Sequence, residues 1–154
     1  MNPLRLLAVI EARTITGPAK NLLQFASKSA ALGVTVSIAT FVRDEESNLF
    51  IDTARGAGLA VHTIPESGPF DRSAMRTLRE LVQGDAPDIV QTHAVKSHFL
   101  ARLAGVPDKH PWIAFHHGYT WPAFRARVYN ELDRWSLRAA TKVLTVSRPF
   151  AREL

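Results

Sequence analysis

Imidazole and ammonium side chains follow several apolar runs of this sequence, and they are its clearest candidates for chemistry. His116 and His117 end a short apolar run that begins at Trp112, while His93 ends another run and Lys96 follows three residues later. Histidine can exchange protons or hydrogen-bond near neutral pH, and lysine can hold an anion. Ligands of open α/β sheets bind beyond the carboxyl ends of the strands. These positions therefore predict a ligand site at such an edge.

The two adjacent histidines are expected to differ in role. Neighbouring side chains of an extended chain point to opposite faces, so only one of His116 and His117 is expected to face a ligand. The same geometry disfavours metal binding by the pair, and no carboxylate-rich cluster supports a metal site. A structural role remains the alternative for His93, because histidines at strand ends are commonly structural.

A glycine opens the first expected helix, where Gly17, Pro18 and Ala19 follow a polar loop that contains Arg13. Free N–H groups and the helix dipole favour an anion such as a diphosphate at this position. The segment matches neither the dinucleotide fingerprint G-x-G-x-x-G nor the P-loop. A structural turn glycine is therefore the alternative to a phosphate contact.

Apolar runs alternate with helical patterns along the whole chain. The expected strands are residues 4–10, 34–40, 59–64, 88–92, 112–116 and 142–146. The expected helices are residues 17–31, a segment from Asp44 or Ser47 to Arg55, a segment from Asp71 to a turn at 84–87, residues 95–104, residues 122–140 and a segment that begins at Ser147. The alternation predicts an α/β fold, a Rossmann-like three-layer α/β/α domain with a mostly parallel sheet.

Composition narrows the class of protein. The chain has 154 residues, of which 46% are hydrophobic and 21% charged, as in one globular domain. The absence of cysteine excludes a disulfide scaffold and a cysteine nucleophile. No segment resembles a signal peptide or a membrane span, so a cytoplasmic location is expected. The net charge of +5 favours an anionic partner, although a merely basic protein is an equal alternative. No nucleic-acid recognition motif is present, so no nucleic-acid partner is expected.

The helix expected at residues 122–140 has an apolar stripe and a basic face. The stripe comprises Trp121, Phe124, Val128, Leu132, Trp135 and Ala139, and the basic face comprises Arg127, Arg134 and Arg138. The pattern favours a helix packed on the core with a solvated basic side. Peripheral contact with an anionic membrane, assisted by Phe70, is the alternative.

Five segments in order resemble the N-terminal domain of GT-B glycosyltransferases, specifically the retaining glycosyltransferase family four. They are Gly17–Leu23, Leu32–Val36, Pro87–His93, Phe115–Gly118 and Ala139–Ser147. The third is close to the family's Pro-Asp-Ile-Val-His-x-His stretch, and the fourth resembles its strand-end His-Gly. Four positions depart from the family pattern: Pro18 replaces a glycine, Lys20 an acidic residue, Gln91 a histidine and Thr141 an aspartate.

The resemblance implies a two-domain, hexosyltransferase-like enzyme with its site in the cleft between the domains. Residues 1–154 would form the acceptor-side half, and the donor-binding half, with its Glu-x7-Glu motif, is absent from this sequence. The enzyme would move a sugar from a nucleotide-diphosphate sugar to a glycan or lipid-linked acceptor, such as a cell-envelope glycan. It would do so with retention and would need neither a metal nor another cofactor.

The resemblance also assigns roles to residues of this chain. His117 would lie by the transferred sugar, with His116 as the alternative catalytic histidine. Gly17 and Ala19 would lie by the donor diphosphate.

On the acceptor side, the resemblance places His93 by the acceptor, and we expect Lys96 and Arg13 to bind it as well. With half of the cleft missing, the 154-residue chain alone is expected to be inactive. The competing hypothesis is a stand-alone, non-catalytic α/β module that binds a nucleotide or phosphosugar.

Overall fold

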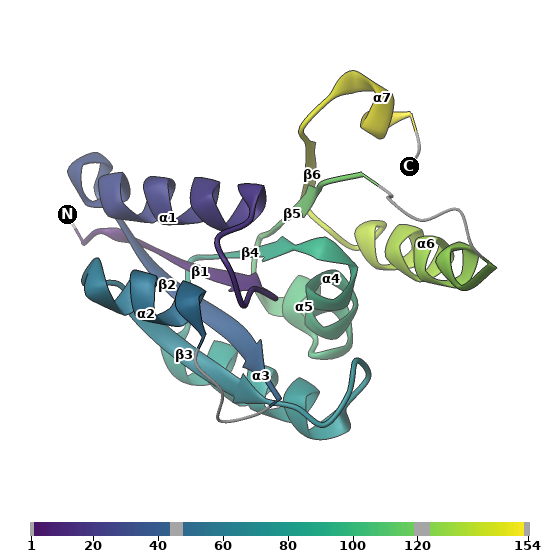
Figure 1. Ribbon diagram of the computed structural model, residues 1–154, viewed down its shortest axis with the longest axis horizontal. Coiled ribbons are helices and arrows are strands. Elements are labelled where there is room, and N and C mark those ends of the chain that lie inside the picture. The colour runs from purple at the N-terminus through teal and green to yellow at the C-terminus, as the bar shows by residue number, and fades with distance from the viewer. Residues whose placement is uncertain (1, 44–47, 119–123, 153–154) are drawn as a thin grey trace.

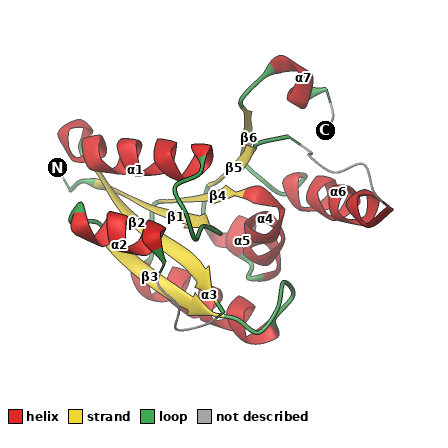
Figure 2. Cartoon of the chain, viewed as in Figure 1, coloured by secondary structure: helices red, strands yellow, loops and turns green. Residues whose placement is uncertain are grey.

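A computed structural model describes residues 2–43, 48–118 and 124–152. Within these residues the strands form one six-stranded sheet in the order β3-β2-β1-β4-β5-β6, and every neighbouring pair is parallel (Figure 2). The strands are β1 (Leu4–Ile10), β2 (Val34–Val42), β3 (Ala60–Pro65), β4 (Ile89–His93), β5 (Trp112–His116) and β6 (Lys142–Thr145). The expected Rossmann-like α/β architecture is confirmed.

Helices cover both faces of the sheet (Figure 1). They are α1 (Gly17–Ser29), α2 (Leu49–Gly56), α3 (Arg72–Asp85), α4 (Ala94–Leu103), α5 (Val106–Lys109), α6 (Phe124–Leu137) and α7 (Arg148–Ala151), with a short 3-10 helix, η1 (Ala30–Leu32). Strand β1 contributes to both layers of the core. Its Leu7 and Val9 lie in the cluster formed with α3, α4 and α6, whereas Ala8 lies in the cluster formed with α1 and α2. Such double burial explains why the central strands are continuous apolar runs.

The start of α2, the end of α3 and the presence of α5 differ from the sequence-based expectation. The proposed caps Asp44 and Ser47 lie outside the described residues, and Asn48 caps α2 by accepting a hydrogen bond from the Ile51 amide at 3.0 Å. Helix α3 continues through the expected turn to Asp85, and Ala86 ends it in a left-handed conformation. Helix α5 was not expected, because proline is more often taken as a breaker than as a first-turn residue.

The expected core packing of the apolar stripe of α6 is wrong at Val128 and Trp135, although Ala139 packs on the core and Arg127 and Arg138 are exposed as expected. Val128 and Trp135 of the apolar stripe are 53% and 38% exposed, whereas Asp133, Ser136 and Leu137 are buried. Trp121 and the side chain of Phe124 lie outside the described residues. Asp133 decides the orientation, because a buried carboxylate requires hydrogen-bond partners and finds them on the core side of the helix.

The sheet brings the ends of β1 and β4 together. Ile10 pairs in register with His93, and His93 pairs with Phe115 of β5. The chain continues from β1 to α1 on one face and from β4 to α4 on the other, so the strand order reverses here. This topological switch point is where open α/β sheets bind ligands. The residues that follow β1, β4 and β5 therefore meet at the edge predicted for the site.

Candidate functional site

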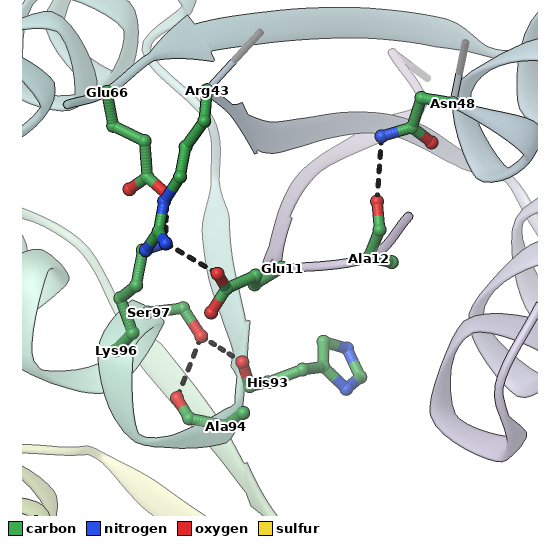
Figure 3. Close-up of polar contacts among 9 residues, drawn as sticks. All are labelled: Glu11, Ala12, Arg43, Asn48, Glu66, His93, Ala94, Lys96 and Ser97. Atoms are coloured by element: carbon green, nitrogen blue, oxygen red, sulfur yellow. Dashed lines mark hydrogen bonds and ion pairs between the residues drawn. The ribbon is translucent and has the colours of Figure 1, made fainter. Parts of the chain in front are cut away.

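Four charged residues from separate elements form an ion-pair cluster at the carboxyl edge of the sheet: Glu11, Arg43, Glu66 and Lys96. Lys96 Nζ donates to Glu66 Oε1 at 2.6 Å and to Glu11 Oε1 at 2.8 Å. Arg43 Nε donates to the same Glu66 oxygen at 2.9 Å. Figure 3 shows the side chains converging from the ends of β1, β2 and β3 and from the first turn of α4. The cluster ties these elements together.

The centre of the cluster is buried. The side chains of Glu66 and Lys96 are only 2% and 9% exposed, whereas those of Glu11 and Arg43 are 45% and 46% exposed. Buried charges are tolerated when they are paired in good geometry. Both cations contact Glu66 Oε1, and Oε2 has no hydrogen-bond partner among the described residues. Because Lys96 serves two carboxylates, its charge is already balanced within the protein.

A cavity of about 120 Å³ adjoins the ion-pair cluster. Its lining combines charged, amide and apolar side chains: Glu11, Arg13, Phe41, Val42, Arg43, Asn48, Ile51 and Glu66. Asn48 also ties the start of α2 to the end of β1, because its Nδ2 donates to the Ala12 carbonyl at 3.1 Å (Figure 3). Guanidinium and carboxylate groups around an apolar floor can hydrogen-bond a polar ligand and fix its orientation. Arg13, an expected acceptor residue, lies in this lining.

A second group, the histidine row, consists of Gln91, His93 and His117. Gln91 Nε2 lies 2.7 Å from His93 Nε2, and His93 Nδ1 lies 3.2 Å from His117 Nε2. The His93 and His117 rings stack with centroids 5.5 Å apart and an angle of 13°. Phe115 stacks on His93 at 4.9 Å. Side chains two residues apart share a face of a strand, which explains why alternate residues of β4, and Phe115 of β5 with His117 directly after it, lie together here.

The acceptor residues expected from the sequence are divided between the two groups. The His93 imidazole points away from Arg43 and Glu66 (Figure 3), so it joins the histidine row while Lys96 joins the ion-pair cluster. Ala94, which follows His93, has a φ of 68°. A left-handed conformation costs a non-glycine residue roughly 1–2 kcal/mol. Ser97 compensates by donating to the carbonyls of His93 and Ala94, which fixes the turn into α4.

Burial keeps the histidine row neutral. Desolvation, with smaller contributions from His117 and His98, lowers the pKa of His93 from 6.5 to about 3. Desolvation also lowers the pKa of His117, with smaller contributions from His98 and His116. Neutral imidazoles can donate at one ring nitrogen and accept at the other. The row is therefore suited to directional hydrogen bonding rather than to holding a charge.

His116 and His117 point to different surroundings, as their adjacency predicts. His116 is 3% exposed, and its Nδ1 lies 3.3 Å from Asp133 Oδ2. Asp133 Oδ1 lies 2.7 Å from Nδ1 of His98, which is completely buried. His117 is partly exposed. Of the two predicted catalytic histidines, His117 is thus the one that a ligand can reach.

The start of α1 leaves room for a ligand at the backbone. Gly17 is exposed, and a Cβ at this residue would have no atom within 4 Å. Thr16, the N-cap, makes no side-chain capping bond to a described residue. The side chain of Ala19 is buried, so only its N–H could serve an anion. The predicted diphosphate contact by Gly17 and Ala19 stays a prediction.

The sequence-based search missed Glu66 and Arg43. Each directly follows a strand at the carboxyl edge, which is the kind of position that predicted a ligand site around His93 and His117. Applied to every strand end, the same reasoning would have found both. Within the residues that the structure describes, no three His, Asp or Glu side chains are grouped so as to hold a metal ion.

The ion-pair cluster predicts an unequal cost for removing its two cations. Lys96→Met is expected to lower the free energy of unfolding by about 3 kcal/mol, because Glu66 is left buried beside a partly solvated arginine. Arg43→Met, the matched control, is expected to cost less than about 1 kcal/mol. The double variant Lys96→Met/Glu66→Gln should recover much of the loss. Urea denaturation followed by circular dichroism measures all three, and equal losses for the two single variants would contradict the prediction.

The pKa of His93 predicts a dependence of stability on pH. Between pH 6.5 and about 3 the unfolded chain binds more protons at His93 than the folded chain does. The stabilisation by neutral His93 is therefore complete above pH 6.5 and is lost as the pH falls, by up to about 1.4 kcal/mol per pH unit. His93→Gln should show a shallower loss of unfolding free energy between pH 6.5 and 5. Above pH 7.5 the free energies of unfolding of the two proteins should change with pH in the same way. Equal slopes of unfolding free energy against pH below pH 6.5 would disprove this assignment.

Solved structures share this architecture. HepE from Anabaena in complex with UDP matches with a TM-score of 0.79 and 11% sequence identity, over 97% of this chain and 40% of that one. A glycosyltransferase from Rickettsia africae ESF-5 matches with a TM-score of 0.68 and 20% sequence identity, over 100% of this chain and 39% of that one. MurG from Acinetobacter baumannii matches with a TM-score of 0.66 and 12% sequence identity, over 96% of this chain and 42% of that one. At these identities the likeness shows the fold alone, and the chain spans about two fifths of each of these proteins.

Comparison with the curated proteins gives no match. A family model, described as the glycosyl transferase 4-like domain, matches residues 16–154. The match extends from the N-cap of α1 to the last residue, and so includes β4, β5 and the histidine row. Together with the GT-B fold of the structural neighbours, it shows that this chain belongs to the glycosyl transferase 4-like domain family.

Proposed function

We propose that this chain is the acceptor-side half of a glycosyltransferase that moves a sugar from a nucleotide-diphosphate sugar to a glycan or lipid-linked acceptor, with retention. One observation carries the proposal: the partly exposed His117 and the polar cavity both lie at the carboxyl edge, beside the point where the strand order reverses. The family match supports sugar transfer. The neighbour HepE, solved with UDP and with UDP-glucose, supports a nucleotide-sugar donor.

The residues of this chain have separate roles in the proposal. His117 hydrogen-bonds the transferred sugar, and Arg13 binds the acceptor in the cavity. Lys96 acts indirectly, because its contacts with Glu11 and Glu66 hold the wall of that cavity. His93 contacts the acceptor side through the histidine row rather than through the cavity.

The start of α1 serves the leaving group. The N–H groups of Gly17 and Ala19 stabilise the negative charge that develops on the departing diphosphate, as helix N-termini do. We assign no protein nucleophile and no metal to the transfer. Residues 1–154 supply one wall of the cleft, so the chain alone is expected to transfer no sugar.

The two adjacent histidines allow the proposed site to be tested in the gene product that contains these residues. His117→Ala should lower the rate of sugar transfer from UDP-sugars at least ~100-fold, since it removes a group that contacts the reacting sugar, and should hardly change the melting temperature. His116→Ala should instead destabilise the fold by about 1–3 kcal/mol, because it removes a buried partner of Asp133.

His62→Ala is the control for this pair, because His62 lies on β3 beside Asp85 and should affect transfer little. Release of nucleoside diphosphate and thermal unfolding are the two measurements. Loss of transfer in His116→Ala alone, with intact stability, would reverse the assignment. Ligand binding without transfer in the whole gene product would instead favour a non-catalytic binding module.

We further propose a cytoplasmic location with peripheral contact to the inner face of an anionic membrane. Phe70, Tyr129 and Trp135 are 47%, 38% and 38% exposed, and Phe70 stacks on Tyr129 at 5.9 Å. Exposed Arg127 lies on α6, and exposed Arg138 directly follows the last residue of this helix. Exposed aromatic rings beside arginines suit an anionic bilayer surface. Among the described residues, no helix is long and apolar enough to cross a membrane.

Co-sedimentation with lipid vesicles tests this contact. The chain should bind phosphatidylglycerol vesicles more than phosphatidylcholine vesicles, and added salt should weaken the binding. Trp135→Ser should reduce it, whereas Leu32→Ser, at a residue 74% exposed on η1, should not. Binding that is indifferent to anionic lipid would refute the proposal.

A further inference from the structure

Gln91 is a buried amide that makes no contact with the polar cavity beside the ion-pair cluster. It lies in β4, is 6% exposed, and directs its side-chain nitrogen to His93 at 2.7 Å. The histidine row therefore begins at an amide in the interior and ends at His117 at the accessible edge. In a hydrogen-bonded chain of this form, the donor at one end can fix which ring nitrogen carries the proton in each imidazole along the chain.

The orientation of the Gln91 amide, with its nitrogen toward His93, fixes the donor and acceptor direction of the chain. An amide nitrogen only donates, so the lone pair of His93 Nε2 must accept from Gln91. Neutral His93 has one ring proton, which must then lie on Nδ1, facing His117 Nε2 at 3.2 Å. His117 Nε2 must therefore accept, and the single proton of neutral His117 must lie on Nδ1.

The opposite tautomers would be penalised. A proton on His93 Nε2 would face the Gln91 amide protons, and two buried donors would lose their partners. His93 Nδ1 and His117 Nε2 would then have to exchange roles as well. The orientation of the amide thus sets the polarity of the whole row, and an inverted amide would reverse both tautomers.

We propose that Gln91 is a positioning residue that fixes, through His93, the Nδ1–H tautomer of His117, so that His117 presents a hydrogen-bond donor to a hydroxyl oxygen of the transferred sugar. The identity of this ligand rests on the proposed function, whereas the tautomer does not. Gln91 touches no substrate, and its effect on His117 is transmitted entirely by the two hydrogen bonds of the row.

Nitrogen NMR of the 154-residue chain tests the proposal directly. In chain labelled with ¹⁵N-histidine at pH 7.5, two-bond proton–nitrogen spectra should show Nδ1 protonated and Nε2 unprotonated in both His93 and His117. Gln91→Met has a similar length but no donor, so His117 should lose its single-tautomer pattern and its ring nitrogens should shift toward an average. The control Gln83→Met, at an exposed residue of α3, should change neither histidine.

Two results would overturn the proposal. One is a proton on Nε2 of His117 in the unaltered chain, and the other is an unchanged His117 spectrum in a folded Gln91→Met variant. If that variant does not fold, Gln91→Glu replaces it, because an ionised carboxylate can only accept and should place a proton on His93 Nε2. These spectra do not depend on sugar transfer, so a failure of the proposed function would be seen separately, as absent transfer by the gene product with the expected tautomers intact.

Discussion

The parallel pairing of β4 between β1 and β5 is the constraint on which the rest of the site depends. It aligns Ile10, His93 and Phe115 in one register, so that three strands end together where the strand order reverses. Glu11, Lys96 and His117 come from chain positions far apart and reach one edge only because of that register. A shift of one residue in the pairing register of β4 would turn His93 toward the opposite face of the sheet, and its contact with His117 would be lost.

The site handles its polar groups in two different ways. The ion-pair cluster keeps its charges and balances them, with Glu66 held by Lys96 and Arg43. The imidazoles of the histidine row are neutral instead, because burial lowers the pKa of both His93 and His117. A paired cluster is rigid and can shape a cavity, whereas neutral imidazoles offer one donor and one acceptor in fixed directions. Binding and orientation of a polyhydroxyl ligand need both properties, which is why their closeness at one edge supports sugar transfer.

Helix α6 shows how one buried polar group can override an apolar pattern. The stripe that includes Val128 and Trp135 has regular helical spacing, yet both side chains remain exposed. Asp133 instead faces the core, where it meets His98 and His116. An unpaired carboxylate in the interior costs more than two partly exposed apolar side chains. The same contact holds His116 in the core and leaves His117 to the accessible side.

The sequence by itself determined the alternation of strands and helices, the parallel sheet and the edge at which His93, Lys96 and His117 lie, because these follow from hydrophobic period and strand order. Only the tertiary structure decided which groups pair there. Lys96 and Glu11 are 85 residues apart, and no local pattern couples them. Glu66 and Arg43 gained their roles in the same way, because Glu66 pairs with Lys96 and with Arg43, which lie 30 and 23 residues away in the chain. Side-chain partners depend on register and burial, which exist only once the sheet and its helices have packed.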